Sequence, residues 1–228
     1  MDVLIDNWDI IWRPLVRTLE MVLIAGVMAL VVGAILAAMR VAPIALARAI
    51  GTLYVYTVRN TPLLVIMVIA AFGVPELDVR PTVSLGDAEL LQFDVFFFFA
   101  TAALGFYTAA FVCEALRSGI NSIPLGQAEA ARSIGMTFAQ TLRQIILPQA
   151  VRAVIPPIAS ALIAMTKNSS IALGVGVAEA TFRMKTLTNN YASDLYVIFI
   201  AFALFYMAIV AVIAGVAALL ERKLRVAR

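Results

Sequence analysis

The sequence predicts an all-α membrane protein that crosses the bilayer five times and forms one transmembrane domain over residues 1–228. Composition is the first reason: the 228 residues are 63% hydrophobic and 14% charged, with a mean hydropathy of +0.99. A soluble domain of this length needs more polar surface to cover its core. The second reason is that several apolar runs approach the ~20 residues a helix needs to cross ~30 Å of hydrocarbon.

Apolar runs and their flanks define the expected spans. They run from about Thr18 to Met39, from Leu63 to Val74, from Val95 to about Leu116, from roughly Ala153 to Ala178, and from Leu195 to Leu220. The second run is too short alone, so we expect it to include the turn Leu53–Val58. Thr61 is a good N-cap there, and Pro62 suits the first helical position, where its missing N–H costs nothing.

The distribution of basic residues is the third reason, and it predicts the orientation. Eleven of them fall on one side of this span assignment: Arg40, Arg48, Arg59, Arg117, Arg132, Arg143, Arg152, Arg222, Lys223, Arg225 and Arg228. Five fall on the other: Arg13, Arg17, Arg80, Arg183 and Lys185. Because cytoplasmic loops carry the excess of Lys and Arg, the N-terminus is predicted outside and the C-terminus inside.

The segment between the third and fourth spans, about residues 118–152, predicts a cytoplasmic helical hairpin. Gln127–Ile134 can form a short helix with Glu129 in its first turns, where the helix dipole favours an acid. Gly135 interrupts it, Phe138–Leu147 can form a second short helix, and Pro148 is expected to end that helix.

This hairpin carries an apolar face with helical spacing. Its members are Ile134, Phe138, Leu142, Ile145 and Ile146, opposite Arg132, Gln140, Arg143 and Gln144. Such a face must be buried against the protein itself, the bilayer or a partner.

The same segment resembles the coupling loop of bacterial ABC importer permeases. Glu129-Ala130-Ala131, then Gly135, then Ile145, Leu147 and Pro148 reproduce the pattern E-A-A, three residues, G, nine residues, I-x-L-P. The resemblance implies a type I ABC importer permease fold, in which the hairpin docks on a cytoplasmic ATPase. It also implies that Ala130 and Ala131 allow close approach and that Gly135 provides the turn. The alternative is an ordinary interfacial amphipathic helix.

Three further segments extend the resemblance to polar amino-acid permeases. Arg59-Asn60-Thr61-Pro62-Leu63-Leu64 is similar to R-G-T-P-L-L, with Asn60 in place of the usual Gly. Tyr107 to Ile120 is similar to Y-x-A-A-Y-x-A-E-x-x-R-G-G-I, and Lys167-Asn168-Ser169-Ser170 to K-N-(S/T)-S. The variants are most similar to actinobacterial glutamate-type permeases.

The family resemblance implies an assembly and a substrate class. The chain would pair with itself or a related permease in the bacterial cytoplasmic membrane, with membrane lipid around it and no nucleic acid. Two cytoplasmic ATPase subunits and an external amino-acid-binding protein would complete an importer for a polar amino acid, with glutamate or glutamine expected.

The residues themselves indicate that the chain is not an enzyme. It shows no nucleophile–base pair, and Gly174-Val175-Gly176 is too short to cradle a phosphate. The absence of His argues against a zinc or haem site. We therefore expect no catalytic, cofactor or metal site here, and ATP with Mg²⁺ on the partner subunits.

Charged residues within or beside the spans are the candidates for a substrate pathway. Glu114 lies near the inner end of the third span with Arg117 one turn later, so the pair can be a helix-end ion pair or part of a gate. Arg59 can anchor the inner interface and help to fix the helix start at Asn60-Thr61-Pro62, or it can line the pathway.

Lys167 is the other candidate. It lies 14 residues along the fourth span from Ala153, or roughly 21 Å at 1.5 Å per residue. Its ammonium can snorkel to the outer interface. However, Thr166, Asn168, Ser169 and Ser170 surround it and cover every direction around a helix, which favours a polar cavity.

A second function class is an ion-coupled amino-acid carrier, or a membrane enzyme, that works without an ATPase. Such a carrier should show inverted repeats with broken helices in both halves. The sequence shows one broken segment, at Asn60-Thr61-Pro62.

Overall fold

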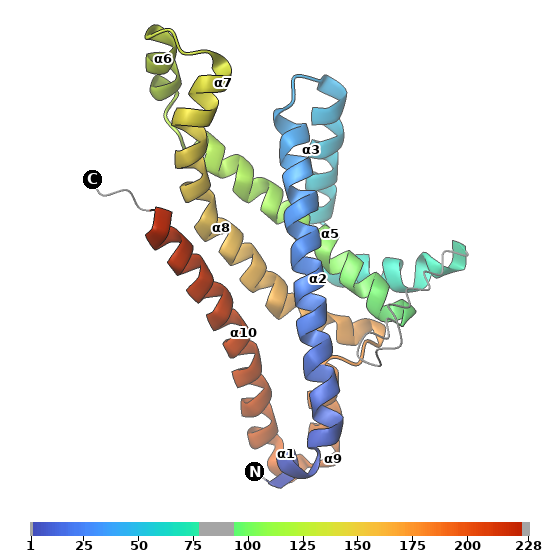
Figure 1. The fold of residues 1–228 in the computed structure, drawn as a ribbon. Helices are drawn as coiled ribbons and strands as arrows, with labels where there is room; N and C mark the ends of the chain where they lie inside the picture. Colours follow the sequence, from blue (N-terminus) through green and yellow to red (C-terminus); the bar gives the residue numbers. More distant parts are fainter. Residues whose placement is uncertain (1, 78–93, 225–228) are drawn as a thin grey trace, which may run out of the picture.

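The structure is a computed structural model that describes residues 2–77 and 94–224, and the secondary structure of these residues is entirely helical. The α-helices are α1 (Asp2–Asp6), α2 (Trp8–Val41), α3 (Ala45–Arg59), α4 (Leu63–Val68), α5 (Val95–Asn121), α6 (Leu125–Ser133), α7 (Phe138–Thr141), α8 (Leu147–Asn168), α9 (Ala180–Asn190) and α10 (Leu195–Leu224). Short π-helical turns (Ile69–Gly73 and Leu142–Ile146) and 3₁₀ turns (Pro75–Leu77, Ser169–Val175 and Ala192–Asp194) connect them. Figure 1 shows α6 and α7 at one end of the long helices and α1 and α9 at the other.

Four helices in the described residues are long and apolar enough to cross a membrane: Trp8–Val41, Val95–Asn121, Pro148–Val175 and Ala192–Lys223. They contain most or all of the first, third, fourth and fifth predicted spans. The fourth begins earlier than predicted, because the helix already runs through Pro148. Arg80, Arg225 and Arg228, which entered the charge count, lie outside the described residues.

The second predicted span is broken. Ala45–Arg59 and Leu63–Leu77 meet at an angle of 105° and pass the same length and hydropathy test only as a pair. The expectation that Leu53–Val58 extends the Leu63–Val74 helix is therefore wrong. Pro62 has no N–H to continue the ladder of α3, and it takes an extended ψ of 134° as the N-cap of α4.

The predicted N-cap at Thr61 is also wrong. Its hydroxyl donates backwards to the Thr57 carbonyl at 2.8 Å, and the Asn60 amide donates to the Tyr56 carbonyl at 2.7 Å. Both side chains therefore close the end of α3 instead of opening α4. Asn60, where the family has Gly, takes a negative φ of −94° that any residue can adopt.

Helices α2 and α5 form the central contact of the fold. Ala25 on α2 and Ala109 on α5 are fully buried, and Gly33 of α2 lies against Val112 of α5. A Cβ at Gly33 would come within 2.7 Å of Val112 and 3.0 Å of the Ala109 carbonyl oxygen. Small residues at such positions let two helix backbones approach closely, as is typical of membrane proteins.

Apolar side chains remain exposed along the outer helices. On α10 they include Phe199, Leu204, Met207 and Val212, each more than half exposed. Such a face suits lipid or a second subunit and not water.

Candidate functional site

The α6–α7 hairpin is built by local capping. Gly135 takes a φ of +87°, the left-handed region that glycine enters without strain, and it separates α6 from α7 as predicted. Thr137 and Gln140 then form a reciprocal cap: the Thr137 N–H donates to Gln140 Oε1 at 2.9 Å, and the Gln140 N–H donates to Thr137 Oγ1 at 3.3 Å. This T-x-x-Q capping box starts α7.

Two predicted details of the hairpin are wrong. Helix α6 begins at Leu125 and not at Gln127, so Glu129 lies in its second turn, where the helix dipole acts less on it. Pro148 does not end the second helix either. The chain passes from α7 through the π-helical turn Leu142–Ile146 into α8, and Pro148 lies in the first turn of α8, where its missing N–H is tolerated.

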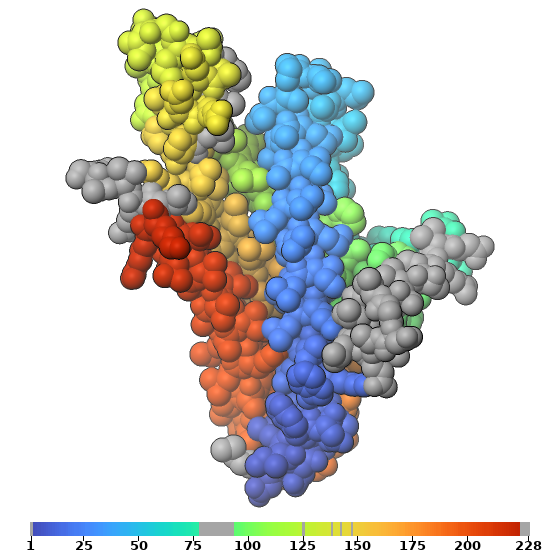
Figure 2. All heavy atoms as spheres, in the orientation of Figure 1, coloured from blue at the N-terminus to red at the C-terminus, as the bar shows by residue number. Residues whose placement is uncertain are grey.

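The outer surface of the hairpin has few contacts with the rest of the chain. Ile134 is 80% exposed, and Glu129 and Ala130 are exposed, whereas Ala131 is buried. A Cβ placed on Gly135 would meet nothing within 4 Å. In Figure 2 the hairpin projects at one end of the molecule. At Ile134 the apolar face predicted from the sequence is thus left uncovered by the described residues.

Gln149 connects the hairpin to α8. Its amide Nε2 donates to Gln127 Oε1 at 2.6 Å and to the Ile145 carbonyl at 2.8 Å. This bridge joins residues 22 positions apart, so no local sequence pattern predicts it. It links α6 to the first turn of α8, so displacement of α6 acts on α8.

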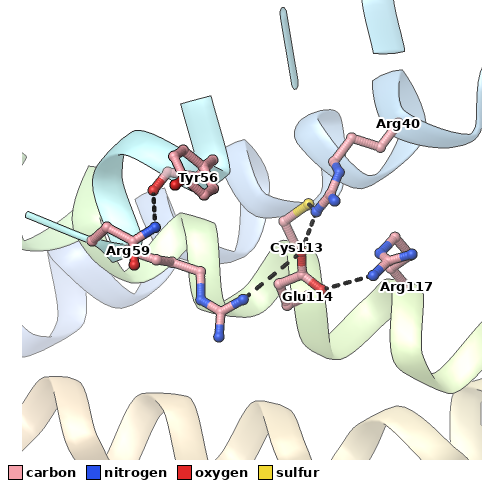
Figure 3. Close-up of polar contacts among 7 residues, drawn as sticks. Arg40, Tyr56, Arg59, Cys113, Glu114 and Arg117 are labelled. Carbon is pink, nitrogen blue, oxygen red and sulfur yellow. Dashed lines mark hydrogen bonds and ion pairs between the residues drawn. The ribbon is translucent and has the colours of Figure 1, made fainter. Parts of the chain in front are cut away.

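Glu114 on α5 is the centre of an arginine cluster. Arg40 from α2 donates to Glu114 Oε1, and Arg117 donates to Glu114 Oε2 at 3.3 Å. Arg59 from α3 places its Nη1 3.9 Å from Glu114 Oε1. Figure 3 shows the three arginines converging on this one carboxylate.

The cluster confirms the helix-end ion pair between Glu114 and Arg117 and adds two partners to it. Arg40 is the one that sequence reasoning missed. The available signal was its position at the inner end of the first span, at the same predicted level as Arg59 and Arg117. Its side chain is 12% exposed, against 44% for Arg59 and 41% for Arg117, so Arg40 is the most deeply held of the three.

A cavity of about 330 Å³ lies beside the cluster. It is lined by Arg40, Thr52, Val55, Tyr56, Arg59, Asn60, Phe111 and Glu114. The Arg59 guanidinium carbon lies 5.3 Å from the centre of the Phe111 ring, a cation–π distance that orients the side chain. Two guanidinium groups and one carboxylate line the cavity, so positive charge is in excess there.

The polar run Thr166–Ser170 lies at the end of α8, where the helix tightens into a 3₁₀ turn. Its hydroxyls bond to the backbone of their own helix: Thr166 to the Leu162 carbonyl at 3.0 Å, Ser169 to Thr166 at 2.7 Å and Ser170 to Lys167 at 2.7 Å. Thr166 and Ser169 are buried. Each hydroxyl therefore has a partner on its own segment, and the polar cavity around this run stays a prediction.

Lys167 differs from these neighbours. Its side chain is exposed on the single chain, and no ion pair between described residues involves it. Hydrogen bonds and ion pairs likewise do not join the Thr166–Ser170 run to the Glu114 cluster within the part of the chain that the structure describes. The candidate pathway residues thus form two separate groups.

Comparison with known proteins decides the family. Residues 29–226 match the family described as binding-protein-dependent transport system inner membrane component. The chain belongs to this family. It is therefore a multi-pass permease component of an ABC importer in the inner membrane, and the family implies an assembly with ATPase and binding-protein partners.

Individual relatives agree. The chain is 43% identical to the glutamate transport system permease protein GluC of Corynebacterium efficiens over 190 residues, covering 83% of each chain. It is 35% identical to the glutamate/aspartate import permease protein GltJ of Escherichia coli K12, covering 94% of this permease and 87% of that one.

Solved structures confirm the fold. A crystal structure of an amino acid ABC transporter with histidines superposes with a TM-score of 0.80 at 25% identity, covering 96% of both chains. An inward-facing form of the MetNI methionine ABC transporter matches with a TM-score of 0.65 at 19% identity, covering 95% of this chain and 96% of that chain, which supports the fold alone.

Proposed function

We propose that this permease carries a polar amino acid, glutamate or glutamine, across the cytoplasmic membrane, driven by ATP hydrolysis on partner subunits. The observation that carries the proposal is the similarity over most of the chain to permeases named for glutamate transport. The whole of residues 1–228 would act as one transmembrane domain. The chain would bind no cofactor, and ATP with Mg²⁺ would bind to two cytoplasmic ATPase subunits.

The α6–α7 hairpin is the proposed contact with the ATPase. Its motif residues are Glu129, Ala130, Ala131, Gly135, Ile145, Leu147 and Pro148. The exposed Ile134 supports this role, because an 80% exposed isoleucine at the tip of a projecting hairpin suits a protein partner. A homodimer or a heterodimer with a related permease would present two such hairpins, one to each ATPase.

The connection between hairpin and span suggests how the coupling works. Helix α7, the π-helical turn and α8 follow one another without a break, and Gln149 ties α6 to the same unit. A push on the hairpin would thus move α8 as a whole. Its 22 residues span about 33 Å at 1.5 Å per residue, and Lys167, Asn168, Ser169 and Ser170 lie at its far end.

The proposed substrate pathway uses both polar groups. Lys167 would meet the substrate carboxylate or an acid of a partner, whereas Glu114, Arg117 and Arg59 would shape the inner end of the path. Their cluster holds α2, α3 and α5 together. Movement of α3 at the Asn60–Pro62 break would open or close this end.

Reconstitution with the ATPase and the binding protein tests the function. We expect L-glutamate or L-glutamine to stimulate ATP hydrolysis. Gly135→Val should lower the stimulated rate roughly tenfold, because a β-branched residue at φ +87° costs on the order of 1–2 kcal/mol and changes the turn. Gly126→Ala is the matched control: it lies in α6, has no positive φ, and its added Cβ meets nothing within 4 Å.

Two results would contradict the proposal. Stimulation by no amino acid would remove the transport function, and uptake driven by an ion gradient without the ATPase would support the secondary carrier. Normal stimulation in Gly135→Val would remove the docking assignment alone.

Cysteine labelling tests the orientation, with the N-terminus outside and the C-terminus inside. On a Cys113→Ala background, an impermeant thiol reagent should label Lys185→Cys in intact cells. It should label Gln140→Cys only after permeabilisation. Both positions are exposed in the structure, so access is decided by the side of the membrane. The reverse pattern would invert the topology.

A further inference from the structure

A charged cavity lies at the end of the molecule opposite the α6–α7 hairpin. Its volume is about 320 Å³, within the range of small-molecule sites, and the first half of α2 forms most of its wall. Three arginines and two carboxylates line it: Arg13, Arg17, Arg183, Asp9 and Glu20. Trp12 adds an aromatic side chain.

A buried carboxylate fixes the helix that carries Arg183. Glu179 is 0% exposed and caps α9 by accepting from the backbone N–H groups of Thr181 and Phe182, each at 2.8 Å. The Tyr206 hydroxyl of α10 donates to it at 2.9 Å. Burial raises the pKa of the Glu179 carboxyl, and these hydrogen bonds oppose the rise. All of these hydrogen-bond partners are neutral, so none of these bonds pairs the Glu179 carboxylate with the Arg183 guanidinium.

A second buried bond attaches α9 to α2. The Ala180 N–H donates to Thr18 Oγ1 at 2.9 Å, and Thr18 is fully buried. Thr18 in turn donates to the Pro14 carbonyl at 3.1 Å, within the helix that lines the cavity. Arg183 lies one turn beyond Ala180, so these bonds hold it against the charged face of α2. The cavity is therefore preorganised by side chains that do not themselves line it.

The arginines of the cavity differ in the interactions they make with the rest of the protein. Arg17 pairs with Asp94 at 2.9 Å and lies over the Phe97 ring at 5.7 Å. The Nε of Arg183 is buried and has no hydrogen-bond partner among the described residues. A buried guanidinium donor without a partner is costly unless a ligand or water satisfies it.

We propose that this cavity is an outer binding site for an amino acid with two carboxylates, a proposal that rests on the transport function above. Arg183 and Arg13 would pair with the carboxylates, since guanidinium groups bind carboxylates in a two-pronged geometry. Asp9 and Glu20 would hold the ammonium group. The cavity carries charges of both signs, which suits a zwitterion. The phosphate headgroup of an anionic lipid has no ammonium group and would leave the two carboxylates of the cavity without a partner.

Equilibrium binding tests the site. The importer, assembled with its ATPase but without the binding protein, is mixed with radiolabelled L-glutamate, L-glutamine or glutarate. We expect saturable binding of L-glutamate, and weaker binding of L-glutamine, which lacks one carboxylate, and of glutarate, which lacks the ammonium. Arg183→Gln should weaken L-glutamate binding about tenfold or more, because a charge-assisted pair is lost. Arg13→Gln, at an exposed position, should weaken it in the same direction.

Lys185→Gln is the matched control, because Lys185 is an exposed cation on α9 that does not line the cavity. It should bind L-glutamate like the parent chain. Wild-type affinity in both arginine variants, or equal loss in Lys185→Gln, would overturn the site. If L-glutamate stimulates ATP hydrolysis but does not bind saturably, the outer site fails alone, whereas failure of every amino acid to stimulate removes the proposed function.

Discussion

The two polar groups inside the spans satisfy their polar atoms in opposite ways. Around Glu114, side chains from α2, α3 and α5 meet in ion pairs between residues as far apart as 74 positions. In the Thr166–Ser170 run, each hydroxyl returns to a carbonyl three or four residues earlier on the same segment. The first group depends on tertiary structure, and the second would persist in an isolated helix.

The two groups therefore differ in role. The Glu114 cluster fixes helices relative to one another, whereas the Thr166–Ser170 run leaves a charged side chain available to bind a ligand. The Glu114 carboxylate is fully engaged by its arginines, so its main effect is to hold α3 against α2 and α5. The hydroxyls of the second group donate to carbonyls of their own segment. Lys167 is therefore the member of this group with an ionic group to offer a ligand or a second subunit.

The largest expected effect on stability comes from removing the shared carboxylate. Glu114→Gln leaves three guanidinium groups around a neutral amide, and we expect the free energy of unfolding to fall by about 2 kcal/mol or more. The value lies below that of a fully buried pair because Arg59 and Arg117 are more than one-third exposed. Thermal unfolding in detergent measures it. Glu129→Gln, at an exposed position on α6, should leave the midpoint unchanged, and equal midpoints for the two variants would contradict the fixing role.

A smaller effect should distinguish the arginines from one another. Arg40→Gln removes the most buried partner, which also lies 3.9 Å from the Cys113 sulfur, and should cost about 1–3 kcal/mol. Arg59→Gln should cost about 1 kcal/mol or less, since that side chain is 44% exposed. Double-mutant cycles with Glu114→Gln should give the larger coupling for Arg40. A larger coupling energy for Arg59 than for Arg40 would mean that the burial of the arginine does not determine the strength of its pairing with Glu114.

The smallest effect on stability is expected at Lys167, where the effect on transport is largest. Lys167→Met keeps the length of the side chain and removes its charge, so stability should change by about 0.5 kcal/mol or less. Transport should be lost while ATPase assembly and basal hydrolysis remain. Ser170→Ala is the neighbouring control, because its hydroxyl bonds only to the backbone in the structure, and it should transport normally. Normal transport kinetics in Lys167→Met would exclude an essential role for the charge.

Local patterns predicted much of this fold. The start of α5 at Val95 and of α10 at Leu195 were predicted to the residue, and Asp94 caps α5 by accepting from the Phe97 N–H. The turn at Gly135 was predicted correctly as well. These features depend on a few adjacent residues, which a sequence displays directly.

The misplaced features depend on geometry that a linear pattern does not contain. Pro148 is a helix breaker by type, but a π-helical turn placed it where its missing N–H does no harm. Arg40 has no local partner, so its pairing with Glu114 emerges only when α2 packs on α5. Glu179 was not singled out at all, although a lone acid following the apolar stretch before Ala180 was a signal for a capped helix start.

The close seam between α2 and α5 restricts how the permease can move during a transport cycle. Gly33 packs closely against Val112 and the Ala109 carbonyl, so this contact fixes the register of α2 relative to α5. Sliding one helix along the other by a residue would push a side chain toward the backbone of its partner, so this contact disfavours translation of α2 along α5. We therefore expect the α2–α5 pair to stay together during the transport cycle, without a piston-like movement of α2 past α5.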